Sequence, residues 1–88
     1  MTEVKLWHIE IVIDEHTERT RAKARLTTPD ATLVGLGLAR LSPDDTNVPE
    51  IGDELAVSRA LADVAHQLLE KSASDIEGIT HLPANLPR

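Results

Sequence analysis

Cysteine is absent from this sequence, and Trp7 is its only aromatic residue. Without cysteine the chain can form neither disulfides nor thiolate metal sites. Proteins that read single-stranded RNA or DNA usually stack the bases on aromatic rings, so one tryptophan is a poor basis for that kind of recognition. The core must therefore be aliphatic, and any binding of nucleic acid would have to depend on charge.

Long hydrophobic runs are also missing. No window comes near the ~20 apolar residues that a membrane-spanning helix needs. The N-terminus lacks a basic region followed by an apolar stretch, so no secretory signal is visible. We therefore expect a cytoplasmic protein that has no contact with a membrane.

The length of 88 residues is enough for a single domain with a modest core. The net charge is −6, and it is unevenly distributed. Residues 1–41 carry six basic and six acidic side chains, whereas residues 42–88 carry three basic and nine acidic ones. A negative chain argues against general binding to phosphate backbones, but it does not exclude a local basic patch.

Alternation of apolar and polar residues predicts three strands, at about residues 4–15, 20–27 and 32–41. In the first two strands one side is apolar and is expected to face the core. The residues on that side are Trp7, Ile9, Ile11, Ile13, Ala22, Ala24 and Leu26. By the same hydropathy criterion, the third strand is expected to point Val34, Leu36 and Leu38 inward. Gly35, Gly37 and Ala39 would then face outward.

A hairpin of the first two strands has one favourable register. Pairing Ile11 with Ala24 places all the apolar pairs on one face. It also places Asp14 opposite Arg21 and Glu10 opposite Arg25. A slip of one residue would destroy both patterns, so the register is well specified by the sequence.

The stretch from Ile51 to Lys71 is predicted to be an amphipathic helix. With Leu61 as the centre, Val57, Val64, Ala65 and Leu68 fall within about 60° at 100° per residue. The polar residues expected on the far, solvated side are Arg59, Asp63, His66, Gln67 and Glu70. The spacing of Ser74 and Glu77 is that of a capping box and predicts a short second helical turn, followed by an extended tail over residues 81–88.

The expected fold class is therefore α+β. A three-stranded antiparallel meander would be followed by one long helix packed on one face, in the order β-β-β-α. One helix covers only one face of the sheet, so the other face should remain open.

Basic residues gather on that open face, and they are the candidate site for nucleic acid. They are Arg21, Lys23, Arg25 and Arg40, with Arg19 nearby. One interpretation is a strip that contacts phosphates. The other is a cross-strand ladder of ion pairs with Asp14 and Glu10, each stabilising the fold by up to about 1 kcal/mol. The sequence leaves both open.

A second apolar stripe extends the helix's apolar arc to about half its circumference, although one packed face needs only a little over 100°. Its members are Ile51, Leu55, Ala62 and Leu69. The stripe could cover an edge of the sheet, receive the tail or contact a partner. It is the candidate dimer contact.

No pattern in the chain points to catalysis or to a cofactor. The stretch from Gly35 to Arg40 begins like a dinucleotide-binding loop, but it lacks the third glycine and lies within a strand. Acidic residues near Asp14 and near Asp44 lack the spacing of a metal loop. No nucleophile and base occur in a recognisable arrangement. We expect no enzymatic activity, no metal and no cofactor.

Several stretches together resemble a known protein family. They are IDEH at 13–16, TRAKARL at 20–26, LVGLGLARLSP at 33–43, VPEIGDELAVSRALADVAHQLL at 48–69 and SDIEGITHLPA at 74–84. The family consists of small actinobacterial, dormancy-associated proteins with a double-stranded-RNA-binding-like domain of unknown function. The resemblance implies a β-β-β-α fold, homodimers and a likeness to ribosome hibernation-promoting factors.

Two functions follow as expectations. In the first, the protein is a stress-associated accessory factor that binds ribosomes or structured RNA through the basic cluster and down-regulates translation. In the second, it is a homodimeric interaction or regulatory module that binds no nucleic acid. The expected helix carries more acid than base, unlike the strongly basic helices of hibernation factors. The ligand, the dimer geometry and the inducing signal do not follow from the sequence.

Overall fold

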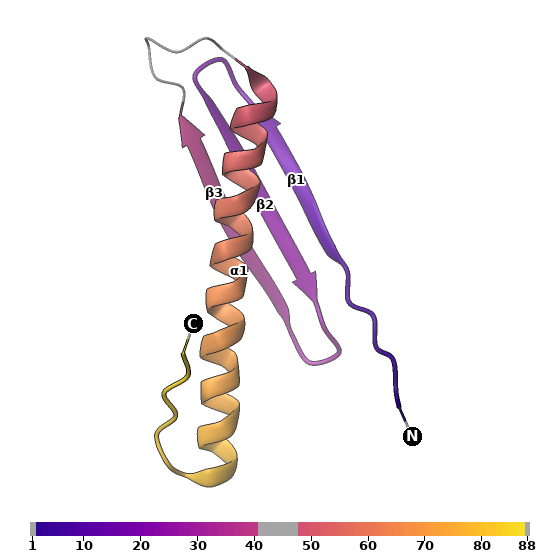
Figure 1. Ribbon diagram of the computed structural model, residues 1–88, viewed down its shortest axis with the longest axis vertical. Helices are drawn as coiled ribbons and strands as arrows, with labels where there is room; N and C mark the ends of the chain where they lie inside the picture. The colour runs from indigo at the N-terminus through magenta and orange to yellow at the C-terminus, as the bar shows by residue number, and fades with distance from the viewer. Residues whose placement is uncertain (1, 41–47, 88) are drawn as a thin grey trace.

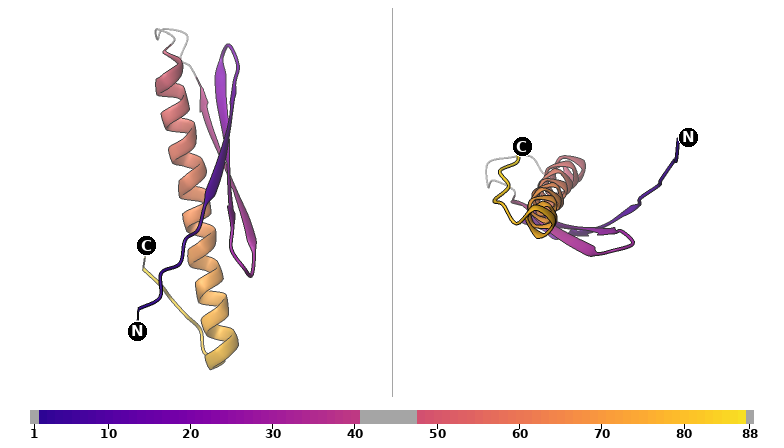
Figure 2. Two further views of the ribbon diagram at one scale, coloured as in Figure 1. Left: turned by 90° about the vertical axis from the view of Figure 1, so that its right-hand side faces the viewer. Right: turned by 90° about the horizontal axis from the view of Figure 1, so that it is seen from below.

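Three strands and one long helix make up the chain, in the expected order. The computed structural model describes residues 2–40 and 48–87. The elements are β1 (Ile9–Glu15), β2 (Arg19–Thr27), β3 (Thr32–Arg40) and α1 (Pro49–Thr80). The strands form one antiparallel sheet in the order β1-β2-β3, and α1 crosses one face of it (Figures 1 and 2). The α+β, β-β-β-α prediction is confirmed.

The β1–β2 hairpin has the register that the sequence predicts. Ile11 pairs with Ala24, and Asp14 and Glu10 lie opposite Arg21 and Arg25. β1 is shorter than expected, because it begins at Ile9 rather than near residue 4. Residues 2–8 before it lie outside the sheet.

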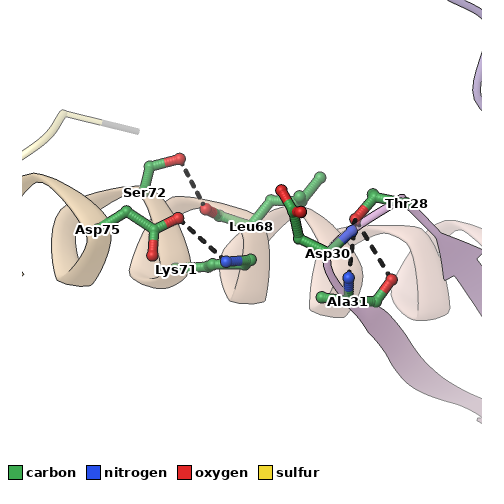
Figure 3. Close-up of polar contacts among 7 residues, drawn as sticks. All are labelled: Thr28, Asp30, Ala31, Leu68, Lys71, Ser72 and Asp75. Atoms are coloured by element: carbon green, nitrogen blue, oxygen red, sulfur yellow. Dashed lines mark hydrogen bonds and ion pairs between the residues drawn. The ribbon is translucent and has the colours of Figure 1, made fainter.

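A four-residue turn joins β2 to β3. The hydroxyl oxygen of Thr28 accepts hydrogen bonds from the backbone N–H groups of Ala31, at 3.1 Å, and of Asp30, at 3.3 Å. The backbone N–H of Thr28 donates to the carbonyl of Ala31 at 2.8 Å. Figure 3 shows this turn beside the α1 segment that contains Leu68. The turn closes the strands so that Thr27 pairs with Thr32.

This pairing reverses the expected orientation of β3. Ala22 pairs with Gly37 and Ala24 pairs with Gly35, so the two glycines lie on the face that carries α1. Val34, Leu36 and Leu38 instead share the open face with the basic residues of β2. The prediction that these three residues face the core is therefore wrong.

Small residues explain the reversal, because they let the helix approach the sheet closely. A Cβ on Gly35 would meet the backbone carbonyl oxygen of Ala60, and a Cβ on Gly37 would meet that of Ala56. The buried hydrophobic residues are mostly alanines. They are Ala22, Ala24, Leu26, Ala39, Ala56, Ala60 and Val64. Larger side chains on this face of β3 would push the helix away and break the contact.

The buried face of α1 is therefore rotated from the expected one. Val64 is buried, and Val57, Leu61 and Leu68 are only partly buried at the margin of the core. Ala65, which the helical wheel places near the centre, is exposed. The centre of the contact between α1 and the sheet is therefore made by the smallest residues of the helix rather than by the most hydrophobic ones.

Polar side chains of α1 bind the outer edge of β3. The Asp63 carboxylate accepts a hydrogen bond from the Leu36 backbone N–H at 2.9 Å. The Gln67 side chain donates to the carbonyl of Val34 at 2.7 Å, and Arg59 donates to the carbonyl of Leu38. The expectation that these three residues lie on a solvated far side is wrong. They occupy backbone groups that an edge strand would otherwise leave unpaired.

The helix continues without a break to Thr80, where the prediction ends it near Lys71 and starts a second turn. Lys71 pairs with Asp75 at 3.0 Å, and the Ser72 hydroxyl donates to the Leu68 carbonyl at 3.0 Å (Figure 3). Both interactions span one helical turn and join the two predicted pieces. At the end, His81 adopts a left-handed conformation with φ 60° and donates its N–H to the Glu77 carbonyl. The expected end of the third strand at Leu41 and the residues of the following loop, up to 47, lie outside the described residues.

Substitution of Gly37 tests the close approach. Gly37→Ala should lower the free energy of unfolding by about 1–3 kcal/mol, because the new methyl group meets backbone that cannot move aside. Gly78→Ala is the matched control. Nothing lies within 4 Å of a Cβ there, so alanine should stabilise the helix by roughly 0.5–1 kcal/mol. Urea unfolding measures both, and equal effects of the two substitutions would refute the contact.

Acid should weaken the β3 edge through Asp63. The hydrogen bond from the Leu36 N–H, and then that from Gln67, lower the pKa of Asp63 below its ordinary value of 3.8. A lowered folded-state pKa stabilises the fold above the unfolded-state pKa, and this stabilisation is lost as the pH falls through the folded-state value. Asp63→Asn should therefore flatten the dependence of unfolding free energy on pH below about 4. An unchanged pH profile would show that Asp63 does not hold the edge.

Candidate nucleic-acid interface

The cations of the open face form one continuous basic strip. We use this name for Arg19, Arg21, Lys23 and Arg25 on β2 together with Arg40 on β3. Side chains at alternate positions of a strand share a face, which brings the β2 residues to the side away from α1. The register pairs Arg19 with Arg40 and so extends the strip onto β3. All five side chains are exposed. The sequence-predicted candidates are thus brought together.

The ion pairs along the strip are long. The Arg21 guanidinium lies 3.9 Å from the Asp14 carboxylate, and the Arg25 guanidinium lies 4.0 Å from the Glu10 carboxylate. Both pairs are solvent-exposed, where such contacts contribute little to stability. Lys23 has no carboxylate partner among the residues that the structure describes. The ladder interpretation therefore accounts for only part of the strip.

Aliphatic side chains border the strip on both sides. Lys23 lies between Val12 of β1 and Leu36 of β3 in the register, and Leu36 is 57% exposed. Val34 lies opposite Arg25, and Leu38 lies opposite Arg21. Sequence reasoning placed Val12 opposite Lys23 correctly, but it placed glycines on the β3 side and missed Val34, Leu36 and Leu38. The signal that could have found them is the four-residue turn, because pairing Thr27 with Thr32 puts Val34 on the Arg25 face.

A hollow of about 450 Å³ lies at the hairpin end of the strip. Asp14, His16, Arg19 and Arg21 line it together with Leu36, Gly37 and Leu38. Two guanidinium groups at one hollow can bind an oxyanion with several hydrogen bonds. The negative carboxylate of Asp14 repels an anion in this hollow. The hollow therefore favours an extended anion that also contacts the other cations of the strip.

The candidate dimer contacts lie on the other side of the molecule. Ile51 is 54% exposed and Leu55 is 45% exposed, while Ala62 is exposed and Leu69 is partly buried. They lie on the part of α1 that turns away from the sheet. Their placement fits the expected stripe, and the dimer itself stays a prediction.

In the described parts of the chain, no group of three or more His, Asp or Glu side chains is placed to hold a metal ion. Asp44 and Asp45, whose spacing does not predict a metal loop, lie outside the described residues. Among the residues described, no helix has the length and apolarity needed to span a bilayer.

Fold and site together define a small β-β-β-α protein with a basic open sheet face. The chain belongs to the Rv2632c-like family, whose model matches residues 5–85. It is 59% identical, over 80 residues, to the uncharacterized protein Mb1767 of Mycobacterium bovis, covering 91% of this chain and 85% of that protein. It is 56% identical over 79 residues to the uncharacterized protein Rv2632c of Mycobacterium tuberculosis, covering 90% of this chain and 85% of that protein.

A solved structure supports the same assignment. The crystal structure of Rv2632c aligns with a TM-score of 0.85 at 54% sequence identity. The alignment covers 93% of this chain and 98% of that one. These relatives carry no assigned activity, so the function has to be inferred from the site itself.

Removing the paired cations should cost little stability. Arg21→Ala and Arg25→Ala should each change the free energy of unfolding by less than about 1 kcal/mol, because both pairs are long and exposed. Chemical denaturation at low ionic strength measures the change. A loss of several kcal/mol in either variant would assign the strip to the fold rather than to binding.

Proposed function

We propose that this protein is a non-enzymatic accessory factor of the stress or dormancy state that binds ribosomes or structured RNA in the cytoplasm and down-regulates translation. The carrying observation is the basic strip. Five cations share one sheet face, and among residues 2–40 and 48–87 the carboxylates beside them are those of Glu10 and Asp14 on β1, in a chain whose net charge is −6. Concentration of positive charge on one face of an acidic protein is the electrostatic footprint of a polyanion site.

The form of the strip favours phosphate contacts over base reading. Trp7, the only aromatic residue, lines one hollow with Leu33 and Leu68 near α1 and a second hollow with Glu10 and Arg25 at one end of the strip. The strip thus has one ring at its end and no row of aromatic rings on which successive bases could stack. Arginine and lysine at alternate positions of a strand can follow a sugar–phosphate backbone, which is how double-stranded or folded RNA is mostly recognised. The acidic remainder of the surface would orient the strip toward the RNA.

The resemblance to dormancy-associated proteins and to ribosome hibernation factors supports the choice of the ribosome among structured RNAs. This support comes from likeness of fold, whereas the strip is a feature of the chain's own residues. The aliphatic residues Val12, Val34 and Leu36 add a surface beside the cations that can pack on sugars or on ribosomal protein.

A second candidate is a homodimeric interaction module without a nucleic-acid ligand. Exposure of Ile51 and Leu55 on the helix favours it, since half-exposed large aliphatic residues in one stripe are typical of a contact surface. The two candidates share the dimer and differ in the ligand of the open face.

Co-sedimentation with purified ribosomes tests the first candidate. Binding should be strong at low salt and should weaken steeply as salt rises, because released counterions drive it. Arg21→Glu combined with Lys23→Glu should weaken binding by at least about tenfold and reduce the salt slope by roughly two.

The control changes the net charge equally but away from the strip. Lys5→Glu combined with Lys71→Glu should leave binding within about twofold of the unmodified protein, since those residues border the Trp7 hollow instead. Failure of the unmodified protein to sediment with ribosomes or to bind folded RNA at low salt would contradict the proposal. Equal losses in the two double variants would show a general charge effect.

A further inference from the structure

The one tryptophan of the chain lies outside its core. Trp7 is 52% exposed, although tryptophan side chains are highly buried on average in folded proteins. It belongs to the segment before β1, which runs on beyond the paired part of the sheet (Figure 1). Packing between α1 and the sheet therefore does not explain why a large aromatic ring stands half in water at this place.

Trp7 borders two hollows. On the side of α1 it lines the hollow that also contains Leu33 and Leu68. On the open face it lines a hollow of about 390 Å³, which we call the Arg25 hollow. The other residues that line the Arg25 hollow are Leu6, His8, Glu10, Arg25 and Thr27. Trp7 thus lies between the helix side and the open face, and it can be reached from the basic strip.

The Arg25 hollow combines three groups that bind nucleotides. The ring of Trp7 offers a surface on which a base can stack. The guanidinium of Arg25 can bind a phosphate, and the carboxylate of Glu10 can accept hydrogen bonds from the N–H groups of a base. These two charged groups lie 4.0 Å apart, and both side chains are solvent-exposed, so each is free to contact a ligand.

We propose that the Arg25 hollow holds an unpaired nucleotide at the end of a structured RNA bound along the basic strip, with its base stacked on Trp7. This inference rests on the proposed binding of structured RNA and adds a subsite to it. The strip holds the phosphates of the paired region, whereas the hollow holds the first nucleotide beyond it.

The positions of the strip and the hollow determine which nucleotide can enter. From Arg19 to Arg25 the strip follows β2 for about 20 Å, at roughly 3.3 Å per residue. Bases inside a duplex are stacked on their neighbours and cannot reach a protein ring, whereas unpaired bases at ends can turn outward. Trp7 precedes the last pair of the hairpin, Ile9 with Leu26, so it lies just past the end of the strip. A duplex that covers the strip would end there.

The carboxylate of Glu10 favours guanine in the hollow. Guanine presents its N1–H and its N2 amino group side by side, and these two donors match the two oxygens of one carboxylate. Uracil presents a single N–H between two carbonyl oxygens, which a carboxylate repels. Guanine also has the larger surface for stacking. An unpaired guanosine should therefore bind better than an unpaired uridine.

The opposite end of the strip does not offer the same chemistry. The hollow at the hairpin is lined by Asp14, Arg19 and Arg21, and it has no aromatic ring because Trp7 is the only one in the chain. The two ends of the strip are thus different. The RNA is bound in one direction, with its unpaired end toward Trp7.

Trp7 emission reports on the hollow directly, because the chain contains no other tryptophan and no tyrosine. The probes are short RNA hairpins that end bluntly, in an unpaired guanosine or in an unpaired uridine. Filter binding at low salt gives their affinities for the full chain. The unpaired guanosine should tighten binding by at least about fivefold over the blunt hairpin and should quench Trp7 emission, since one base stacks on the ring. The unpaired uridine should add less.

Substitutions separate the ring from the rest of the segment. Trp7→Leu should reduce the gain from the unpaired guanosine to within about twofold and leave the affinity for the blunt hairpin unchanged. Trp7→Phe keeps a smaller ring and should keep part of the gain. Val4→Ala is the matched control, because Val4 lies in the same segment, is 89% exposed and does not line the hollow. Circular dichroism confirms that each variant is folded.

Glu10→Gln tests the choice of base. It removes a negative charge beside the strip and should strengthen binding of all three hairpins, because the phosphates are then repelled less. The ratio of the affinities for the guanosine and uridine hairpins should fall toward one, since a single carboxylate no longer accepts both donors of guanine. An unchanged ratio would contradict the role of Glu10 in the hollow.

The outcomes distinguish this inference from the function on which it rests. If neither ribosomes nor any hairpin binds, both are overturned. Binding to ribosomes but to none of the hairpins would overturn the inference alone. So would equal affinity and equal Trp7 emission with the blunt and guanosine hairpins, or a full gain retained by Trp7→Leu. Guanosine monophosphate that saturates the hollow at the same concentration as the guanosine hairpin would replace the RNA end with a free nucleotide as the ligand.

Discussion

Backbone contact between α1 and the glycines of β3 is the constraint on which the other features depend. Because Gly35 and Gly37 have no side chains, the carbonyls of Ala56 and Ala60 can lie where Cβ atoms would otherwise stand. Alanines on β2 complete a flat surface for the helix. Close approach compensates for the small size of the buried groups, since dispersion attraction depends on distance and on the number of contacting atoms.

The position of the helix decides what the surfaces can do. Over β2 and β3, α1 reaches the outer edge of β3 with Arg59, Asp63 and Gln67 and closes it to pairing with another strand. The same position leaves the isoleucines of β1 open on one face. On the other face, the aliphatic residues displaced from the core of β3 lie beside the basic strip. A binding surface of mixed cationic and aliphatic character thus arises from the demand for small residues underneath the helix.

Alternation of apolar and polar residues predicted the hairpin of β1 and β2, because the pattern of charges and the pattern of hydropathy favour the same register there. Ile11 opposite Ala24 and Asp14 opposite Arg21 are consequences of one register. In β3, hydropathy conflicts with the register that the turn imposes. Leu36 is more hydrophobic than Gly35 and is therefore expected in the core, whereas the turn that pairs Thr27 with Thr32 places Gly35 there. Connectivity is the stronger constraint, since a turn fixes which residues face each other, whereas hydropathy only expresses a preference. The same preference misplaced Asp63 and Gln67, because a polar side chain on a helix can bind a strand edge as well as water.

The cations of the candidate site and their β1 neighbours were predictable from the sequence, whereas their β3 neighbours were not. Arg21, Lys23 and Arg25 follow from alternation within one strand, but Val34 and Leu36 required the correct orientation of the next. The most direct test of the account is therefore an NMR measurement of which β3 protons lie close to the helix. The account predicts nuclear Overhauser effects from the Hα protons of Gly35 and Gly37 to protons of Ala56 and Ala60, and none from the Leu36 methyl groups to the alanine face of α1. Strong effects from the Leu36 methyl groups to Ala56 and Ala60 would contradict it.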